Sequence, residues 1–266
     1  MKYKSDICKN IFRGYDIRGI YPSEIDEDTA YTIGLGFGSH IKSIGKTNCV
    51  VGHDNRLSSP VLYEALIKGI TETGIDVISL GLCTTPMYYY ACIKLKVFSG
   101  VMVTASHNPK DDNGFKFAFD EAGNCKGQEI QDFLEFILKG EFSSGEGHVS
   151  NYDITNDYIE LFKNNINFGK RRIKVVVDPG NGTTAIIVKK IYDLFPMDII
   201  YINDESDGTF PNHHPDPCVE DNLAQLKAKV KEVGADVGVS FDGDGDRLGV
   251  VTGKGQFIPT DIYMIL

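Results

Sequence analysis

The residues with the clearest chemical potential are three aspartates that alternate with glycines. The segment DGDGDR, residues 242–247, follows the run 237–241, which is typical of a strand. Alternate residues of an extended chain point the same way, and the glycines let the backbone curl until the carboxylates converge. Carboxylates this close repel one another unless a cation lies between them. The pattern therefore predicts a metal site with Asp242, Asp244 and Asp246 as ligands.

A ligand set made only of oxygen favours a hard ion, Mg²⁺ or Ca²⁺. EF-hand loops also begin D-x-D-x-D, but here Arg247 stands where that loop needs glycine, and Gly253 where it needs glutamate. Three carboxylates underfill a Ca²⁺ shell, whereas Mg²⁺ often takes few protein ligands together with a phosphate oxygen. We therefore expect one Mg²⁺ per chain. The competing interpretation is a solvated acidic turn.

A second candidate is the segment TASHNP, residues 104–109, which follows the apolar run 98–103. Ser106 would lie at the carboxyl end of a strand, where open α/β sheets bind their ligands. A G-x-S-x-G elbow is absent, which argues against an α/β-hydrolase. His107 and Lys116 offer cationic or basic groups nearby in the sequence. Each signal alone is typical of a surface loop, but together with the aspartates they indicate phosphoryl chemistry.

Two arginine-containing segments add possible phosphate ligands. FRGYDIRG, residues 12–19, contains Arg13, Tyr15 and Arg18, and GHDNR, residues 52–56, ends on Arg56. The planar guanidinium binds two phosphate oxygens at once, which suits it to this task. Surface ion pairs explain Arg13 and Arg56 equally well.

The elements that must position these loops alternate between short β-branched runs and helix-length segments, which is typical of an α/β fold with parallel, buried sheets. A Gly- and Ser-rich stretch, residues 140–151, predicts a boundary. We expect two consecutive mixed α/β domains with mainly parallel sheets, residues 1–150 and 151–253, and a helix over 182–194 in the second.

The end of the sequence suggests a further domain. Thr260 can cap a helix and is followed, after Asp261, by five apolar residues, 262–266, with nothing obvious to bury against. We expect residues 254–266 to be the start of a third domain that is cut off. The alternative is that this segment packs on the preceding domain.

The composition excludes some partners. The 266 residues include 27 Lys and Arg against 37 Asp and Glu, a formal charge of −10. An acidic chain argues against a nucleic-acid or anionic-membrane binder. No apolar run has the ~18 residues of a membrane span, and the N-terminus does not resemble a signal peptide. Six scattered cysteines without C-x-x-C predict a reduced, cytoplasmic protein without zinc. The oligomeric state stays open.

Several of these segments occur together in one known family. The sequence resembles the α-D-phosphohexomutases, and within them the phosphomannomutase/phosphoglucomutase branch, over residues 11–266. The resemblance is carried, in this order, by FRGYDIRG, TASHNP, NGFK, DPGNG, FPNHHPDP and FDGDGDR. TASHNP and DGDGDR at this separation are its most specific part.

The resemblance implies a phosphohexomutase-like fold and an isomerase that moves phosphate between C6 and C1 of a hexose phosphate. The route would be a phosphoserine and a hexose 1,6-bisphosphate, which would also act as activator. Ser106 matches the phosphoserine, and one of its phosphate oxygens would join the three aspartates on Mg²⁺. The remaining matches lie near the phosphate, for proton transfer or clamping, or at the edge of the substrate site: Arg18, His107, Lys116, Arg247 and Tyr15.

The resemblance leaves some points open. Either Lys116 or His107 could be the general base. FPNHHPDP favours mannose or glucose 1- or 6-phosphate as substrate over glucosamine phosphate. Family members carry two further domains that read the sugar and clamp its distal phosphate. We therefore expect residues 1–266 to bind the metal but to turn over little substrate alone.

Three other functions compete with this interpretation. Asp242 and Asp244 after an apolar strand also resemble the nucleophile and acid of haloacid-dehalogenase-type phosphatases, which form an aspartyl phosphate. GNGTTA, residues 180–185, matches G-x-G-x-x-A, and Asp204 follows at a spacing suited to a ribose contact, so a nicotinamide site is a weaker possibility. The non-enzymatic alternative is a metal-dependent module that binds sugar phosphates.

Overall fold

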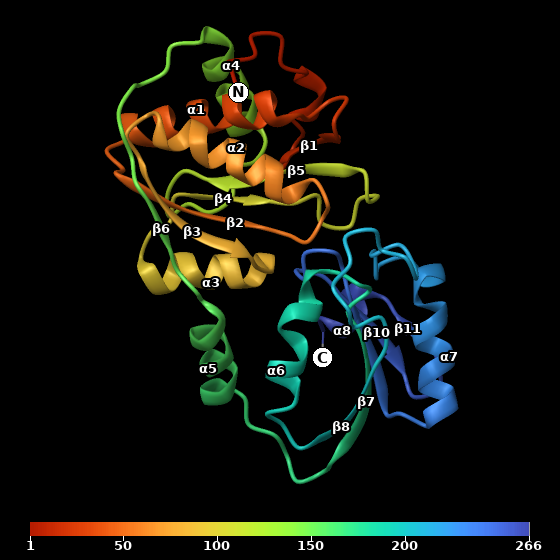
Figure 1. Ribbon diagram of the computed structural model, residues 1–266. Helices are drawn as coiled ribbons and strands as arrows, with labels where there is room; N and C mark the ends of the chain where they lie inside the picture. Colours follow the sequence, from red (N-terminus) through yellow and green to blue (C-terminus); the bar gives the residue numbers. More distant parts are fainter. Residues whose placement is uncertain (266) are drawn as a thin grey trace. The chain divides into compact units, whose positions relative to one another are not determined.

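The computed structural model describes residues 1–265, which form two compact α/β units (Figure 1). The first unit holds Met1–Ala105 and Asp111–Asp153. The second holds Ser106–Lys110 and the chain from Ile154 onward, so the tip of the TASHNP segment groups with the later part of the sequence. Among the described residues, no helix is both long and apolar enough to cross a membrane. The predicted α/β class is confirmed.

The first unit is built on a six-stranded mixed sheet. Its order is β1 (Ile17–Ile20), β5 (Asp112–Ala118), β4 (Gly100–Val103), β2 (Asn48–His53), β3 (Asp76–Leu82) and β6 (Val149–Asn151). Strands β4, β2, β3 and β6 run parallel, whereas β5 pairs antiparallel with both β4 and β1. The carboxyl end of β4 therefore leads into the TASHNP segment, as the apolar run predicts.

Four helices cover this sheet, and η1 (Lys9–Ile11) precedes β1. They are α1 (Glu27–Ser43), α2 (Ser59–Thr71), α3 (Thr85–Leu95) and α4 (Gln128–Lys139). Figure 1 shows α1 and α2 over one face of the sheet and α3 over the other. The helices α1 and α2 approach closely through glycines: a Cβ on Gly34 would lie 2.3 Å from the Leu66 carbonyl oxygen, and one on Gly69 2.3 Å from that of Tyr31.

The second unit holds a five-stranded sheet. Its order is β11 (Phe257–Ile258), β10 (Leu248–Thr252), β9 (Val237–Phe241), β7 (Ile173–Asp178) and β8 (Met197–Tyr201). Strands β9, β7 and β8 are parallel, and β10 and β11 extend the sheet antiparallel. The aspartate segment is thus the connection from β9 to β10.

Alternate residues of β7 bury against opposite helices, as period-2 patterning requires. Val175 and Val177 pack in one cluster with Val188 of α6 (Val188–Tyr192), whereas Val176 packs with Leu226 of α7 (Ala224–Val233) on the other face. The remaining helical segments of this unit are α5 (Thr155–Asn165), η2 (Thr183–Ile186), η3 (Glu220–Leu223) and α8 (Thr260–Tyr263).

The predicted helix over 182–194 is wrong in its first half. The chain forms the 3₁₀ segment η2 and then the short α6, with a break at Ile187. At its start the amide of Thr183 donates to the carbonyl of Gly243 at 2.8 Å, which ties the segment to the aspartate loop. Residues 183–188 also include five β-branched side chains, which lower the helix propensity of this stretch.

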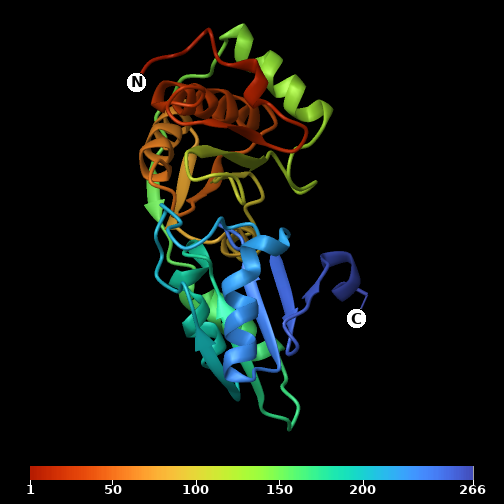
Figure 2. The ribbon, with the colours of Figure 1, turned by 90° about the vertical axis from the view of Figure 1, so that its right-hand side faces the viewer.

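The C-terminal segment forms the short helix α8, which Pro259 precedes at the cap position predicted for Thr260. Figure 2 shows this segment standing out beyond β11. Tyr263 donates from its hydroxyl to the carbonyl of Leu248, while Ile262, Met264 and Ile265 are more than half exposed. Leu266, part of the predicted third-domain start, lies outside the described residues.

Candidate active site

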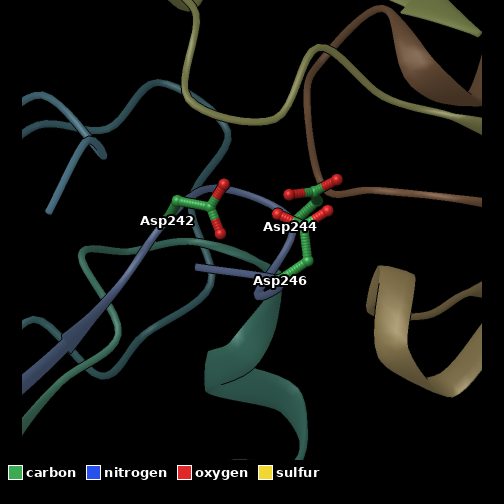
Figure 3. Close-up of side chains that lie close together, drawn as sticks. All are labelled: Asp242, Asp244 and Asp246. Atoms are coloured by element: carbon green, nitrogen blue, oxygen red, sulfur yellow. The ribbon is translucent and has the colours of Figure 1, made fainter. Parts of the chain in front are cut away.

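The loop between β9 and β10 gathers the three predicted metal ligands. One carboxylate oxygen from each of Asp242, Asp244 and Asp246 lies within 4.8 Å of the others. Figure 3 shows all three side chains on this single loop. Asp242 and Asp244 are fully buried, and Asp246 is exposed. Such a group offers only oxygen donors and is accessible to solvent at Asp246, which fits a hard divalent cation.

Asp242 holds the aspartate loop together through hydrogen bonds to its backbone. Its Oδ1 accepts hydrogen bonds from the amides of Gly245 at 3.1 Å and Arg247 at 3.0 Å, which close the turn around the carboxylate. Burial, followed by the charges of Asp244 and Asp246, raises the pKa of Asp242 well above its ordinary value. Bringing these acids together therefore costs free energy that a bound dication would offset.

Ser106 lies beside Asp242. Its hydroxyl donates a 2.7 Å hydrogen bond to Oδ2 of Asp242, and its side chain is almost fully buried. The residue has φ 53°, in the left-handed region that non-glycine residues rarely occupy. Such strain is common at functional positions, where the surrounding structure holds it in place. Of the neighbouring residue His107, Nδ1 lies 3.5 Å from the Ser106 hydroxyl, at the long limit of a hydrogen bond.

Gly243 explains how the two loops meet so closely. A Cβ at this position would lie 2.5 Å from the carbonyl oxygen of Ser106, a distance that real Cβ atoms do not show. The glycine in the aspartate loop is therefore required by the serine backbone and not only by the curl of its own turn.

A third loop, residues 178–182, packs against the aspartate loop. A Cβ on Gly182 would lie 3.0 Å from the carbonyl oxygen of Gly243, and the Thr183 amide already donates to that oxygen. Gly182 thus serves the packing of the two loops, which explains one glycine of the nicotinamide signature without a nucleotide. Asp204, its proposed ribose ligand, instead pairs with Lys189.

A buried ion pair holds this third loop. Asp178, at the end of β7, accepts from the amide of Gly180 at 2.9 Å and from Asn203 at 3.1 Å, and its Oδ2 lies 3.0 Å from Nε2 of His213. His213 belongs to FPNHHPDP, a segment to which sequence reasoning assigned no structural role. The signal was present, because a histidine and a strand-end aspartate are complementary, but their separation of 35 residues hid the pairing.

The first unit holds the other predicted site residues. Arg18, on β1, donates from Nε to Asp16 at 2.6 Å and from Nη1 to the carbonyl of Ala105 at 2.9 Å. It therefore fixes the residue that precedes Ser106 in the chain. Lys116 lies on β5 opposite Met102 and is largely buried, whereas the Tyr15 side chain is 79% exposed. Sequence reasoning did not single out Asp16.

Arg56 has a structural environment. It is 1% exposed, its Nε lies 3.2 Å from Asp54, and Nη1 donates to the carbonyl of Asp112 at 3.0 Å. Asn113, which follows Asp112 in the chain, donates from its side-chain amide to the hydroxyls of Ser58 and Ser59. This polar network ties the start of β5 to the start of α2. The surface ion pair considered for Arg56 is wrong, because the pair is buried.

Comparison with known sequence families identifies both units. Residues 9–144 match the family described as phosphoglucomutase/phosphomannomutase, alpha/beta/alpha domain I, and residues 156–255 match domain II of the same description. The chain belongs to the phosphoglucomutase/phosphomannomutase family. The family resemblance seen in the sequence motifs is thereby confirmed.

Curated relatives agree with this membership. The chain is 42% identical over 258 residues to a phosphomannomutase/phosphoglucomutase of Pseudomonas putida and 44% identical over 258 residues to one of Pseudomonas aeruginosa. It is 39% identical over 264 residues to a phosphoglucomutase of Neisseria meningitidis. The matches cover 97–98% of this chain but 55–57% of the relatives, so the chain spans about half the length of the curated relatives it matches.

Solved structures show the same fold. A phosphoglucomutase/phosphomannomutase family protein from Burkholderia thailandensis superposes with a TM-score of 0.90 at 39% identity, covering 95% of this chain and 56% of that one. A putative phosphomannomutase from Thermus thermophilus gives 0.82 at 27% identity, covering 92% and 57%. The predicted phosphohexomutase-like fold is therefore correct.

Proposed function

We propose that this chain carries the phosphoserine and the metal site of a phosphomannomutase/phosphoglucomutase. The observation that supports it most is the 2.7 Å hydrogen bond from the Ser106 hydroxyl to Asp242, inside a cluster that fits a divalent cation. In this proposal residues 1–150 form domain I with the serine loop, residues 151–253 form domain II with the metal loop, and residues 254–266 begin a third domain.

The charges explain why a metal is needed. A phosphoserine carries about −1.5 to −2, so with three aspartates the cluster reaches roughly −4.5 to −5. Mg²⁺ would be held by Asp242, Asp244, Asp246 and an oxygen on Ser106, where it would neutralise part of that charge and orient the phosphate. Arg247, whose amide already closes the aspartate turn, would offset more.

The chain's own residues would handle the phosphoryl group mainly by positioning. Phosphoryl transfer asks for alignment and charge neutralisation more than for covalent help. Arg18 would hold the TASHNP segment in place through its hydrogen bond to the carbonyl of Ala105. Lys116 or His107 would accept the proton of the attacking sugar hydroxyl. Ser106 would give its phosphate to a hexose monophosphate and take the other phosphate back from the resulting bisphosphate. Tyr15, which is exposed, would contact the sugar.

The proposed substrates are mannose and glucose 1- and 6-phosphate, with a hexose 1,6-bisphosphate as activator. The names of the relatives support these two sugars. Because those relatives are longer than the matched stretch, we propose that residues 1–266 alone accept phosphate on Ser106 but turn over hexose phosphates slowly. Six free cysteines support a reducing location, for which we propose the cytoplasm.

Phosphate transfer to the serine tests the proposal. The purified chain is incubated with Mg²⁺ and ³²P-labelled glucose 1,6-bisphosphate, and the labelled peptide is identified by mass spectrometry. We expect label on Ser106, no label in Ser106→Ala, and normal label in Ser144→Ala, which removes an exposed serine of the first unit. Label that persists in Ser106→Ala would overturn the proposal.

The same experiment separates the alternatives. An aspartyl phosphate, as in the haloacid-dehalogenase-type phosphatases, is released by hydroxylamine, whereas a phosphoserine is not. A module that only binds sugar phosphates would show mannose 6-phosphate binding by calorimetry with no label on any residue. The Ser106–Asp242 hydrogen bond favours the serine route, because it gives the hydroxyl a place in the metal cluster.

A further inference from the structure

A second concave surface lies in the first unit, between the end of α1, the loop after β5 and α4. It encloses about 410 Å³, within the range of small-molecule sites. None of the residues that line it belongs to the serine loop, the aspartate loop or the arginine segments at the start of the chain. The proposed phosphoryl chemistry therefore gives it no role.

Aromatic rings form the floor of this cavity. The ring of His40 lies 4.0 Å from that of Phe119, 5.6 Å from that of Phe136 and 6.4 Å from that of Phe133, measured between centroids. Phe119 and Phe133 meet edge to face at 5.3 Å. Burial lowers the pKa of His40, against a smaller opposing effect of Asp120, which favours the neutral imidazole. All four of these aromatic side chains line the cavity.

Acidic side chains surround the rings. The lining includes four carboxylates, Asp120, Glu129, Asp132 and Glu135, against one cation, Lys139. Glu129 and Asp132 also serve the start of α4, where acids favour the helix dipole and accept from Lys126 and Gln128. Asp120, on the loop after β5, accepts from the amide of Ala122 at 2.8 Å. No such local role accounts for Glu135, two turns into the helix.

We propose that this cavity binds a small organic cation of the quaternary ammonium class. The faces of aromatic rings attract cations, and a charge spread over alkyl groups loses little hydration when it enters an apolar floor. The surrounding carboxylates add long-range attraction for the same charge. An anion would be repelled, so the cavity is not a second site for sugar phosphates. A neutral apolar molecule would gain nothing from the carboxylates.

A pair of isosteric probes tests the charge directly. Choline and 3,3-dimethylbutan-1-ol have nearly the same shape, and only choline carries a charge. Titration of the full chain by calorimetry or by NMR should show choline binding at least about tenfold tighter than the alcohol. Equal binding of the two, or no choline binding up to about 10 mM, would overturn the proposal.

Variants locate the binding. Phe136→Leu keeps apolar volume but removes one π-face, and Glu135→Gln removes one charge with little change in shape. Each should weaken choline binding by about threefold to tenfold and leave the alcohol unchanged. Glu160→Gln, an exposed acid on α5, is the matched control and should bind like the wild type. Wild-type affinity in both cavity variants would refute the assignment. Since Glu135 is exposed, its variant should fold whatever happens to Phe136→Leu.

The result is independent of the phosphoryl proposal. Ser106→Ala should bind choline like the wild type, so a failure of serine labelling leaves this test intact. Competition by glucose 6-phosphate would contradict the cation site, because it would mean that the cavity accepts anions.

Discussion

His213 and Asp178 form a buried ion pair that holds the loop packed against the aspartate loop. Nε2 of His213 lies 3.0 Å from Oδ2 of Asp178, and its Nδ1 lies 2.9 Å from the carbonyl oxygen of His214. Both neighbours are acceptors, so the ring is best satisfied when both nitrogens carry protons. Asp178 also accepts a hydrogen bond from the amide of Gly180, in the loop that packs against the aspartate loop.

This pair predicts a pH-dependent stability. Burial acts to lower the pKa of His213, but the hydrogen bond and charge of Asp178 outweigh it and raise the pKa above 6.5. A raised folded-state pKa gives a contribution that is complete below the unfolded pKa and is lost as pH rises through the folded one. His213→Gln should therefore cost about 1–2 kcal/mol at pH 6 and progressively less at higher pH.

Urea unfolding of both proteins between pH 5.5 and 9 measures the difference. An NMR titration of the His213 ring should show a midpoint above 6.5. His148→Gln replaces an exposed histidine and should match the wild type throughout. A cost of His213→Gln that grows with pH would contradict the assignment of a cationic ring.

Gly243→Ala tests the contact between the serine and aspartate loops. The added methyl would lie 2.5 Å from the Ser106 carbonyl oxygen, so one of the two backbones must move. We expect a loss of about 1–3 kcal/mol in stability and a loss of at least about tenfold in the rate of Ser106 labelling. Gly169→Ala meets no atom within 4 Å and should be neutral in both measurements. Wild-type labelling in Gly243→Ala would show that the close approach is not needed.

Asp244→Asn tests the metal cluster. The amide keeps an oxygen ligand but removes one charge from a group whose affinity depends on its charge count. Mn²⁺ binding, followed by EPR, should weaken at least about tenfold, and the rise in Tm on adding the metal should disappear. Asp221→Asn, an exposed acid of the same unit, should retain both. Undiminished Mn²⁺ affinity in Asp244→Asn would remove this carboxylate from the ligand set.

Arg18→Lys separates positioning from charge. Lysine keeps the charge beside Asp16 but cannot make both the Nε bond to that acid and the Nη1 bond to the Ala105 carbonyl. The segment before Ser106 should become less well held, and the rate of serine labelling should fall by about tenfold. Mn²⁺ affinity should stay unchanged, because Arg18 contributes no ligand. Equal loss of metal binding and labelling would indicate general misfolding instead.

Much of the fold could be predicted from local patterns. The sequence of α4, Gln128–Lys139, indicates a helix, because Ile130, Phe133, Leu134 and Ile137 follow a helical period between two glycines. The sequence of α1 gives a weaker helix signal, since Gly34, Gly36 and Gly38 lower its intrinsic propensity. Those glycines give close packing, with Gly34 against α2, which is a property of the tertiary structure that a local pattern does not reveal.

The site was predictable in its residue types but not in its connections. The three aspartates share one loop, so their spacing was enough to bring them together. The grouping of Ser106 with a loop 136 residues later depends on the left-handed backbone at Ser106 and on the missing side chain of Gly243. The supporting pair of Asp178 and His213 is likewise a long-range contact, which only the folded chain shows.

The central claim is that a phosphate on Ser106 and the aspartate loop bind the same divalent ion. The most direct measurement is ³¹P electron–nuclear double resonance on the phosphorylated chain loaded with Mn²⁺. We predict a ³¹P coupling to the Mn²⁺ in the wild type that is absent in Ser106→Ala treated in the same way. Bound Mn²⁺ without ³¹P coupling in a chain shown by mass spectrometry to carry phosphoserine at position 106 would contradict the claim.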